Sequence, residues 1–224
     1  MGTLELLRAA DIGAGDEVIV PAFGNVEATE AVVLAGALPV FADIDPVTYC
    51  LDPGSVAAAV NPRTAAMIVV HRFGRPADLG PLHTLGGKHG LLVLEQTELD
   101  AVFDGIAQRR AHAALLDARL TGVLTPAGCA GHTYQQYVVR VPGNGRPDRD
   151  AFARTLRARG VACRVPVQTP VHRLPRYRRD LPLPETERAA DETLAVPVDA
   201  GLGPRDMRRV ISACNALGGL LQPA

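Results

Sequence analysis

The sequence predicts an α/β fold: a parallel sheet of about four strands covered by helices, with a smaller α+β domain after it. Two observations support this prediction. Short, wholly apolar segments alternate with helical patterns through the first hundred or so residues, and such segments are typical of parallel strands buried on both faces. Beyond about residue 105 the alternation stops, and longer helical patterns surround a segment that alternates apolar and polar residues.

The elements follow in order. In the first half the apolar segments predict strands at 17–20, 38–42, 66–70 and 91–94. The helical patterns between them lie at 26–35, 54–60 and 79–86. In the second half we expect helices at 106–119, 147–159, 185–194 and 204–217, and strands at 134–141 and 161–165. The proline-rich stretch 166–184 must be a loop, because proline lacks the amide hydrogen that helices and strands use. The resulting domains are 1–105 and 106–224.

Composition excludes several classes of protein. The net charge is −1, so we expect no nucleic-acid or membrane surface. No stretch approaches the roughly 18 apolar residues that a membrane helix needs, and the start lacks the apolar core of a signal peptide. The four cysteines are far apart and lack metal-site spacing, so neither a metal nor a disulfide is expected. These features favour a cytoplasmic protein with reduced cysteines.

Polar residues gather just after the predicted strands. The segments concerned are 21–25, 43–45, 71–74 and 95–98. In open parallel sheets, ligands bind beyond the carboxyl ends of the strands, so this edge is where we expect a site. The alternative for each single residue is that it caps a helix or faces solvent.

Residues 15–96 resemble the DegT/StrS-type sugar aminotransferases, fold-type I enzymes that depend on pyridoxal phosphate (PLP). Four segments in family order carry the resemblance: D-I-D-P-V-T-Y at 43–49, P-R-T-A-A at 62–66, H-R-F-G-R-P-A-D at 71–78 and K-H-G-L-L-V-L-E at 88–95. Looser similarity continues through residues 132–140, 170–172 and 194–197. The resemblance implies a fold-type I scaffold that works as a dimer, with its sites at the interface.

The departures from the family concern the cofactor. The resemblance places at Gln96 an Asp that keeps the pyridinium nitrogen protonated, and a neutral amide cannot do so. The family block with the Ser and the Schiff-base Lys is missing between Glu98 and Ile106, and Leu99 matches a family glutamine. Lys88, the single lysine, precedes its strand and lies more than about 10 Å from the ligand edge. We therefore expect no cofactor, and no transamination by this chain alone.

The first function hypothesis is a PLP-independent enzyme in sugar or specialised-metabolite biosynthesis, derived from this scaffold. Without a cofactor, such an enzyme needs acid and base groups in a cleft, for isomerisation, dehydration, cyclisation or hydrolysis. The candidate catalytic residues are His71, Glu95, Glu98, His132, Tyr134 and His172. The candidate substrate-binding residues are Gly2, Thr3, Phe23, Asn25, Gln96 and Arg164. Gly2 and Thr3 resemble the end of a phosphate-binding Ser-Gly-Thr turn, and arginine side chains such as Arg164 bind phosphate or carboxylate.

The second hypothesis is a non-catalytic partner that binds and stabilises a full-length aminotransferase or another pathway enzyme. With the family's remaining strands missing, the strand at 91–94 becomes an apolar sheet edge, and such edges pair with other chains. We expect a homodimer through residues 91–106. A small molecule in a closed pocket favours the enzyme, whereas copurification with another protein favours the partner.

Overall fold

The computed structural model describes residues 2–97 and 104–218, with only the backbone described at 217 and 218. The chain forms two compact units. The first comprises Met1–Arg72, Pro76–Glu98 and Thr169–Glu187. The second comprises Phe73–Arg75, Leu99–Gln168 and Arg188–Ala224. This division differs from a single boundary at residue 105, because apolar side chains of the stretch 169–187 pack against the first sheet.

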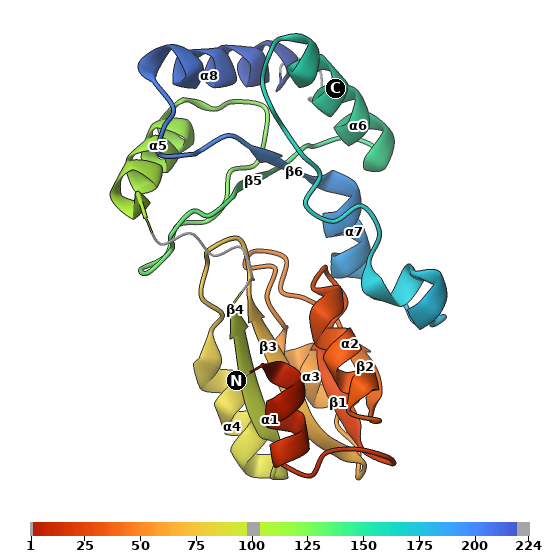
Figure 1. The fold of residues 1–224 in the computed structure, drawn as a ribbon. Helices are drawn as coiled ribbons and strands as arrows, with labels where there is room; N and C mark the ends of the chain where they lie inside the picture. Colours follow the sequence, from red (N-terminus) through yellow and green to blue (C-terminus); the bar gives the residue numbers. More distant parts are fainter. Residues whose placement is uncertain (1, 98–103, 219–224) are drawn as a thin grey trace. The chain divides into compact units, whose positions relative to one another are not determined.

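The first unit is a four-stranded parallel sheet in the order β2-β1-β3-β4 (Figure 1). Its strands are β1 (Glu17–Pro21), β2 (Leu38–Ala42), β3 (Thr64–His71) and β4 (Leu92–Thr97). Its helices include α1 (Thr3–Ala9), α2 (Val26–Leu34), α3 (Pro53–Ala59) and α4 (Leu79–His89). The predicted fold class is therefore confirmed.

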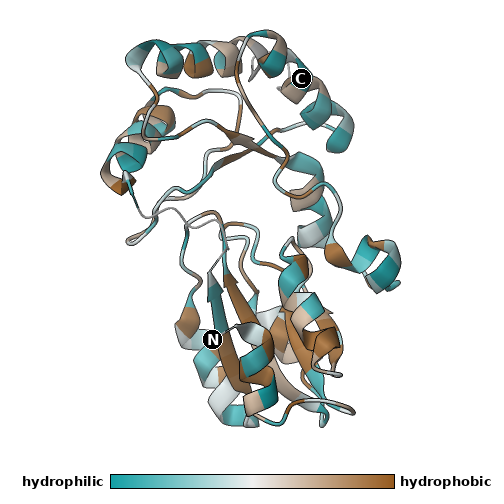
Figure 2. Cartoon of the chain, in the orientation of Figure 1, coloured by the Kyte–Doolittle hydropathy of each residue, from teal (hydrophilic) through white to brown (hydrophobic). Residues whose placement is uncertain are grey.

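The two faces of this sheet are covered by different helices. Alternate residues of a strand point to opposite faces, and in β1 Val18 packs with α1 and α2 whereas Ile19 packs with α3 and α4. The side of α1 and α2 also receives Val171, Tyr177 and Leu183 from the proline-rich stretch. Burial on both faces explains the continuous apolar colouring of the central strands (Figure 2).

Strand β4 ends the sheet within the described residues, as the sequence predicts. It begins one residue later than expected and continues to Thr97, so Glu95 and Gln96 belong to the strand. Leu94 is buried, whereas Glu95 and Thr97 are exposed. The carboxyl half of β4 is accordingly hydrophilic in Figure 2. The edge is therefore apolar only in its first half.

The second unit contains a small antiparallel sheet, in which β5 (Tyr137–Arg140) pairs with β6 (Thr193–Val196). Its helices are α5 (Ile106–Arg119), α6 (Arg146–Ala158) and α8 (Pro204–Gly218). The expected strand at 161–165 is only an isolated bridge between Arg164 and Ala195, because Pro166 cannot donate to a longer ladder. None of the described helices is long and apolar enough to span a membrane.

Two further expectations need correction. Helix α7 (Pro184–Glu192) ends before residue 194, because Thr193 already pairs with Arg140 in the small sheet. The expected strand at 134–141 begins only at Tyr137. The stretch 166–184 lacks regular strands and α-helix up to residue 183, as predicted, and contains two short 3-10 turns, η1 (Val171–Arg173) and η2 (Pro175–Tyr177).

Candidate functional site

The carboxyl ends of β3 and β4 bring a histidine and a carboxylate together. His71 Nε2 lies 3.5 Å from Glu95 Oε2. The Ala77 amide donates to His71 Nδ1 over 3.0 Å. Because Nδ1 accepts this bond, the proton of the neutral ring lies on Nε2, which faces Glu95. The parallel register of β3 and β4 explains why these two side chains lie close together, since Val69 pairs with Glu95 and His71 lies two residues further along β3.

A second histidine completes the group. His83 of α4 has its Nε2 3.6 Å from Glu95 Oε1. We call the three side chains the His71–Glu95–His83 cluster. His71 is 20% exposed, Glu95 44% and His83 53%, so the cluster is open to solvent on the side of His83. Imidazole rings both donate and accept protons, and a carboxylate beside such a ring orients it. Such an arrangement is suited to moving protons.

His83 is missing from the sequence-based candidates, because it lies within a helix rather than after a strand. The pattern of buried residues in α4 could have indicated where His83 lies. Leu82 and Gly86 of α4 are buried, and Gly86 approaches the side chain of Val93. His83 is the neighbour of Leu82, and α4 packs on the face of the sheet that Val93 and Glu95 share.

The other face of β4 carries the positions that the resemblance assigns to the cofactor. Thr3 Oγ1 lies 3.4 Å from Gln96 Oε1, so the hydroxyl donates to a neutral amide. The Gly2 amide donates to the Glu5 carboxylate. A carboxylate therefore occupies the turn where the resemblance implies a phosphate.

These residues do not fit PLP. Gln96 cannot keep a pyridinium nitrogen protonated, and the Glu5 carboxylate repels a phosphate at the turn. Lys88 lies exposed in the last turn of α4, beyond the amino end of β4. A Schiff-base lysine needs a desolvated setting, whereas Lys88 is exposed. No step of the chemistry is therefore assigned to this cofactor.

Two candidate substrate-binding residues make contacts within the first unit. Phe23 is fully buried; its ring stacks on Tyr49 at 5.7 Å, and the Arg72 guanidinium lies 5.5 Å above it. Asn25 is the N-cap of α2, and its side chain accepts from the Ala28 amide at 3.1 Å. Their side chains are engaged within the unit, so their contribution is to hold the strand end in place.

His132 and Tyr134 form a buried stack in the loop before β5. Their rings lie 3.9 Å apart and nearly parallel, and His132 Nδ1 accepts from the Tyr134 amide at 3.0 Å. Burial, followed by the nearby Arg75 charge, lowers the pKa of His132 to about 4. Burial, followed by Asp117, raises the pKa of Tyr134. Both side chains are therefore neutral at ordinary pH, and both are buried within the second unit.

His172 lies fully buried in η1. Its Nε2 is 3.2 Å from Glu187 Oε1, and Arg173 also donates to that carboxylate. Burial raises the pKa of Glu187, but the hydrogen bonds from Arg173 and His172 outweigh it, and the net shift is downward. The pair anchors the stretch 169–187. Glu98, the remaining catalytic candidate, lies outside the described residues.

Comparison with protein families identifies the scaffold. The model of the DegT/DnrJ/EryC1/StrS aminotransferase family matches residues 2–98 and 95–215. The chain belongs to this family. Its fold agrees: DesV of S. venezuelae superposes with a TM-score of 0.84 at 24% identity, covering 96% of this chain and 82% of that chain. The aminotransferase TlmJ of Streptoalloteichus hindustanus gives 0.86 at 25% identity, covering 97% and 83%.

Family members with assigned activities match over shorter stretches. The chain is 49% identical over 89 residues to UDP-N-acetyl-3-dehydro-alpha-D-glucosamine 3-aminotransferase of Acidithiobacillus ferrooxidans, covering 40% of this chain and 24% of the relative. It is 38% identical over 151 residues to L-glutamine:2-deoxy-scyllo-inosose aminotransferase of Streptomyces lividus, covering 67% and 33%. The chain thus spans between a quarter and a third of the length of these relatives.

Family members have an internal segment that this chain lacks, and its place in this chain is directly after β4. The two stretches that match the family model meet at residues 95–98, directly after β4. The similarity to the pleiotropic regulatory protein of Geobacillus stearothermophilus, 28% identical, extends over 286 positions and 76% of that protein. Only 86% of this 224-residue chain takes part, so a long block of the relative has no counterpart here.

Proposed function

We propose that this chain is a PLP-independent enzyme that moves protons in a sugar or another small molecule, on a scaffold inherited from sugar aminotransferases. The observation that carries the proposal is the His71–Glu95–His83 cluster at the ligand-binding edge of the sheet. The misfit of Gln96, Glu5 and Lys88 to PLP supports chemistry without that cofactor.

The members of the cluster have distinct roles in this proposal. His71 carries its proton on Nε2 and is oriented by the Ala77 amide, so the neutral ring donates a hydrogen bond to the substrate oxygen that gains negative charge. Glu95, which is 44% exposed, acts as the general base and accepts a proton from the substrate. His83 exchanges protons between Glu95 and solvent. Isomerisation, dehydration, cyclisation and hydrolysis all use such an acid–base pair.

The substrate class is proposed from the relatives. Those named above act on a keto form of a nucleotide-linked amino sugar and on a deoxy-inosose. A carbonyl acidifies the neighbouring C–H group, which is the kind of proton that Glu95 would remove and return while His71 donates a hydrogen bond to the carbonyl oxygen. We propose that the enzyme works in the cytoplasm, in specialised-metabolite or sugar biosynthesis.

Hydrogen exchange tests the proposal directly. The protein is incubated in D₂O with a panel of keto-sugars and inososes, and deuterium uptake at carbon is followed by NMR. We expect uptake into at least one compound, and His71→Gln and Glu95→Gln should slow it by roughly 10²–10⁴-fold. His89→Gln, an exposed residue at the end of α4, is the matched control. Equal uptake by wild type and both cluster variants would refute the assignment.

A second candidate function is favoured by the edge of the sheet. Within the described residues, β4 has a partner strand only on the side of β3. We propose as the alternative a non-catalytic partner that binds and stabilises a full-length aminotransferase or another pathway enzyme through this edge, within the region 91–106. Copurification with such an enzyme, together with no deuterium uptake above the protein-free rate for the wild type, would favour this alternative.

A further inference from the structure

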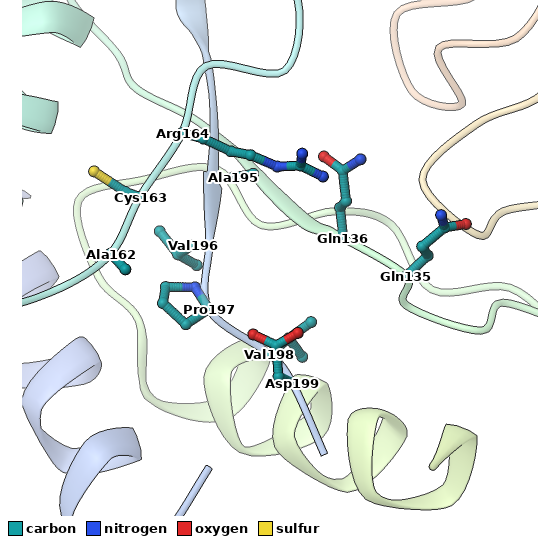
Figure 3. Close-up of a pocket in the computed structure, with 10 residues that line it drawn as sticks. All are labelled: Gln135, Gln136, Ala162, Cys163, Arg164, Ala195, Val196, Pro197, Val198 and Asp199. Atoms are coloured by element: carbon teal, nitrogen blue, oxygen red, sulfur yellow. The ribbon is translucent and has the colours of Figure 1, made fainter. Parts of the chain in front are cut away.

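A cavity opens at one end of the small sheet of the second unit (Figure 3). Its volume is about 320 Å³, and it is lined by residues 135–136, 162–164 and 195–199. The strand register explains its position. Tyr137 pairs with Val196, and Arg164 bridges Ala195, so the segments before and after these pairs diverge. The cavity lies where three segments leave the sheet, and it is formed by the second unit alone.

Two polar groups at this cavity lack hydrogen-bond partners. The guanidinium of Arg164 makes no hydrogen bond or ion pair with the described residues, although its backbone is fixed by two bonds to Ala195. The Gln136 Oε1 atom is buried and has no partner there either. Figure 3 shows the Arg164 side chain extended toward Gln136. A buried acceptor without a donor destabilises a protein, so a bound molecule that donates to Gln136 would gain affinity.

The opposite end of the cavity carries an acidic side chain on a backbone turn that a histidine contacts. Asp199 lies there, away from Arg164 (Figure 3). His112 of α5 places its Nδ1 3.1 Å from the Asp199 carbonyl oxygen and 3.3 Å from that of Val198, which fixes the turn after β6. The cavity therefore offers donors at one end, a buried acceptor beside them, and a carboxylate at the other end.

We propose that this cavity binds a small hydroxylated anion, such as a sugar phosphate or a sugar acid. The anionic group pairs with Arg164, whose planar fork suits phosphate and carboxylate. One hydroxyl donates to Gln136 Oε1 and another donates to Asp199. The volume stands at the lower end of the range of about 300–1,000 Å³ for ligand sites, which fits one ring and its anionic group. The proposal does not depend on the His71–Glu95–His83 cluster, which belongs to the other unit.

Calorimetric titration of the whole chain tests the proposal. Glucose 6-phosphate and glucuronate represent the two anion chemistries, and the tighter of them identifies the group that Arg164 prefers. Glucose and inorganic phosphate each supply only half of the contacts, so we expect each to bind at least about tenfold more weakly. Arg164→Gln and Gln136→Leu should each weaken the sugar anion at least about tenfold.

Arg154→Gln is the matched control, since Arg154 is an exposed arginine of α6 in the same unit and lies outside the cavity. It should bind like the wild type. Thermal melting confirms that the variants are folded, and Asp199→Asn provides a second, surface-exposed probe of the lining. The proposal is overturned if neither sugar anion binds, if Arg164→Gln binds like the wild type, or if glucose or phosphate binds as tightly as the sugar anions.

Discussion

Replacing His132 by asparagine should remove a pH-dependent loss of stability. Burial, followed by the charge of Arg75, lowers the pKa of the folded imidazole from 6.5 to about 4. In the unfolded chain the ring regains a pKa of about 6.5. Between these two values the unfolded chain binds a proton that the folded protein does not bind. The free energy of unfolding therefore falls as the pH falls through this interval.

The shift gives the magnitude. A pKa depression from 6.5 to about 4 corresponds to about 3 kcal/mol of unfolding free energy. Stability from this group is complete above a pH of about 6.5 and is lost as the pH falls toward about 4. Asparagine still offers an oxygen to the Tyr134 amide, which His132 Nδ1 binds at 3.0 Å, but it does not titrate. The variant should therefore lack this component, although it loses the ring stack at every pH.

Urea denaturation of both proteins, at a pH of about 7 and of about 4, measures the effect. The loss of unfolding free energy between the two values should be about 3 kcal/mol smaller for His132→Asn than for the wild type. His89→Asn replaces an exposed histidine and should leave the pH difference unchanged. If His132→Asn shows the pH difference of the wild type, the folded ring titrates like a solvated histidine, and its burial in the second unit is refuted.

Three further predictions concern the fold. A Cβ at Gly74, with φ +83°, would lie 2.7 Å from the Gln135 backbone nitrogen, so Gly74→Ala should lower the free energy of unfolding by more than about 1 kcal/mol. Gly87→Ala, with open space around it in α4, should instead raise the free energy of unfolding by about 0.5–1 kcal/mol. Urea titrations of the two variants measure both changes. Asp43 accepts hydrogen bonds from the amides of Glu185 and Thr186, so Asp43→Ala should lower the free energy of unfolding by about 1 kcal/mol in the same titrations. Asp180→Ala, at an exposed position, should leave the free energy of unfolding unchanged. Light scattering should find a dimer that Thr97→Lys, at the exposed end of β4, weakens; a wild-type monomer would contradict pairing at this edge.

The sequence predicts the first unit well, because each of its strands has one local cause. In β1–β3 the apolar residues are continuous and stop at polar or glycine-containing turns, so the strand positions follow from burial alone. β4 ended later than expected, since Glu95 and Gln96 are polar yet pair with Val69 and Val70 of β3. A hydrophobic pattern cannot reveal hydrogen bonds made by a strand that leaves the core.

The chain beyond residue 105 was harder to predict, because its contacts join distant segments. Arg164 meets Ala195 across about thirty residues of sequence, and residues 169–187 pack with the first sheet. The site shows the same limit. His71 and Glu95 follow from strand ends, whereas His83 depends on how a helix lies over the sheet. Whether His132 is catalytic or structural depends on burial, which its neighbours in sequence do not reveal.

Reduction with borohydride after incubation with one equivalent of PLP tests the central claim most directly. The claim is that the family scaffold is kept while the lysine and the anion that hold the cofactor are gone. Mass spectrometry of the reduced protein should find no stoichiometric pyridoxyl adduct, and the solution should show no saturable yellow complex. A stoichiometric adduct on Lys88, together with transfer of an amino group between a donor and a keto-sugar, would contradict the account.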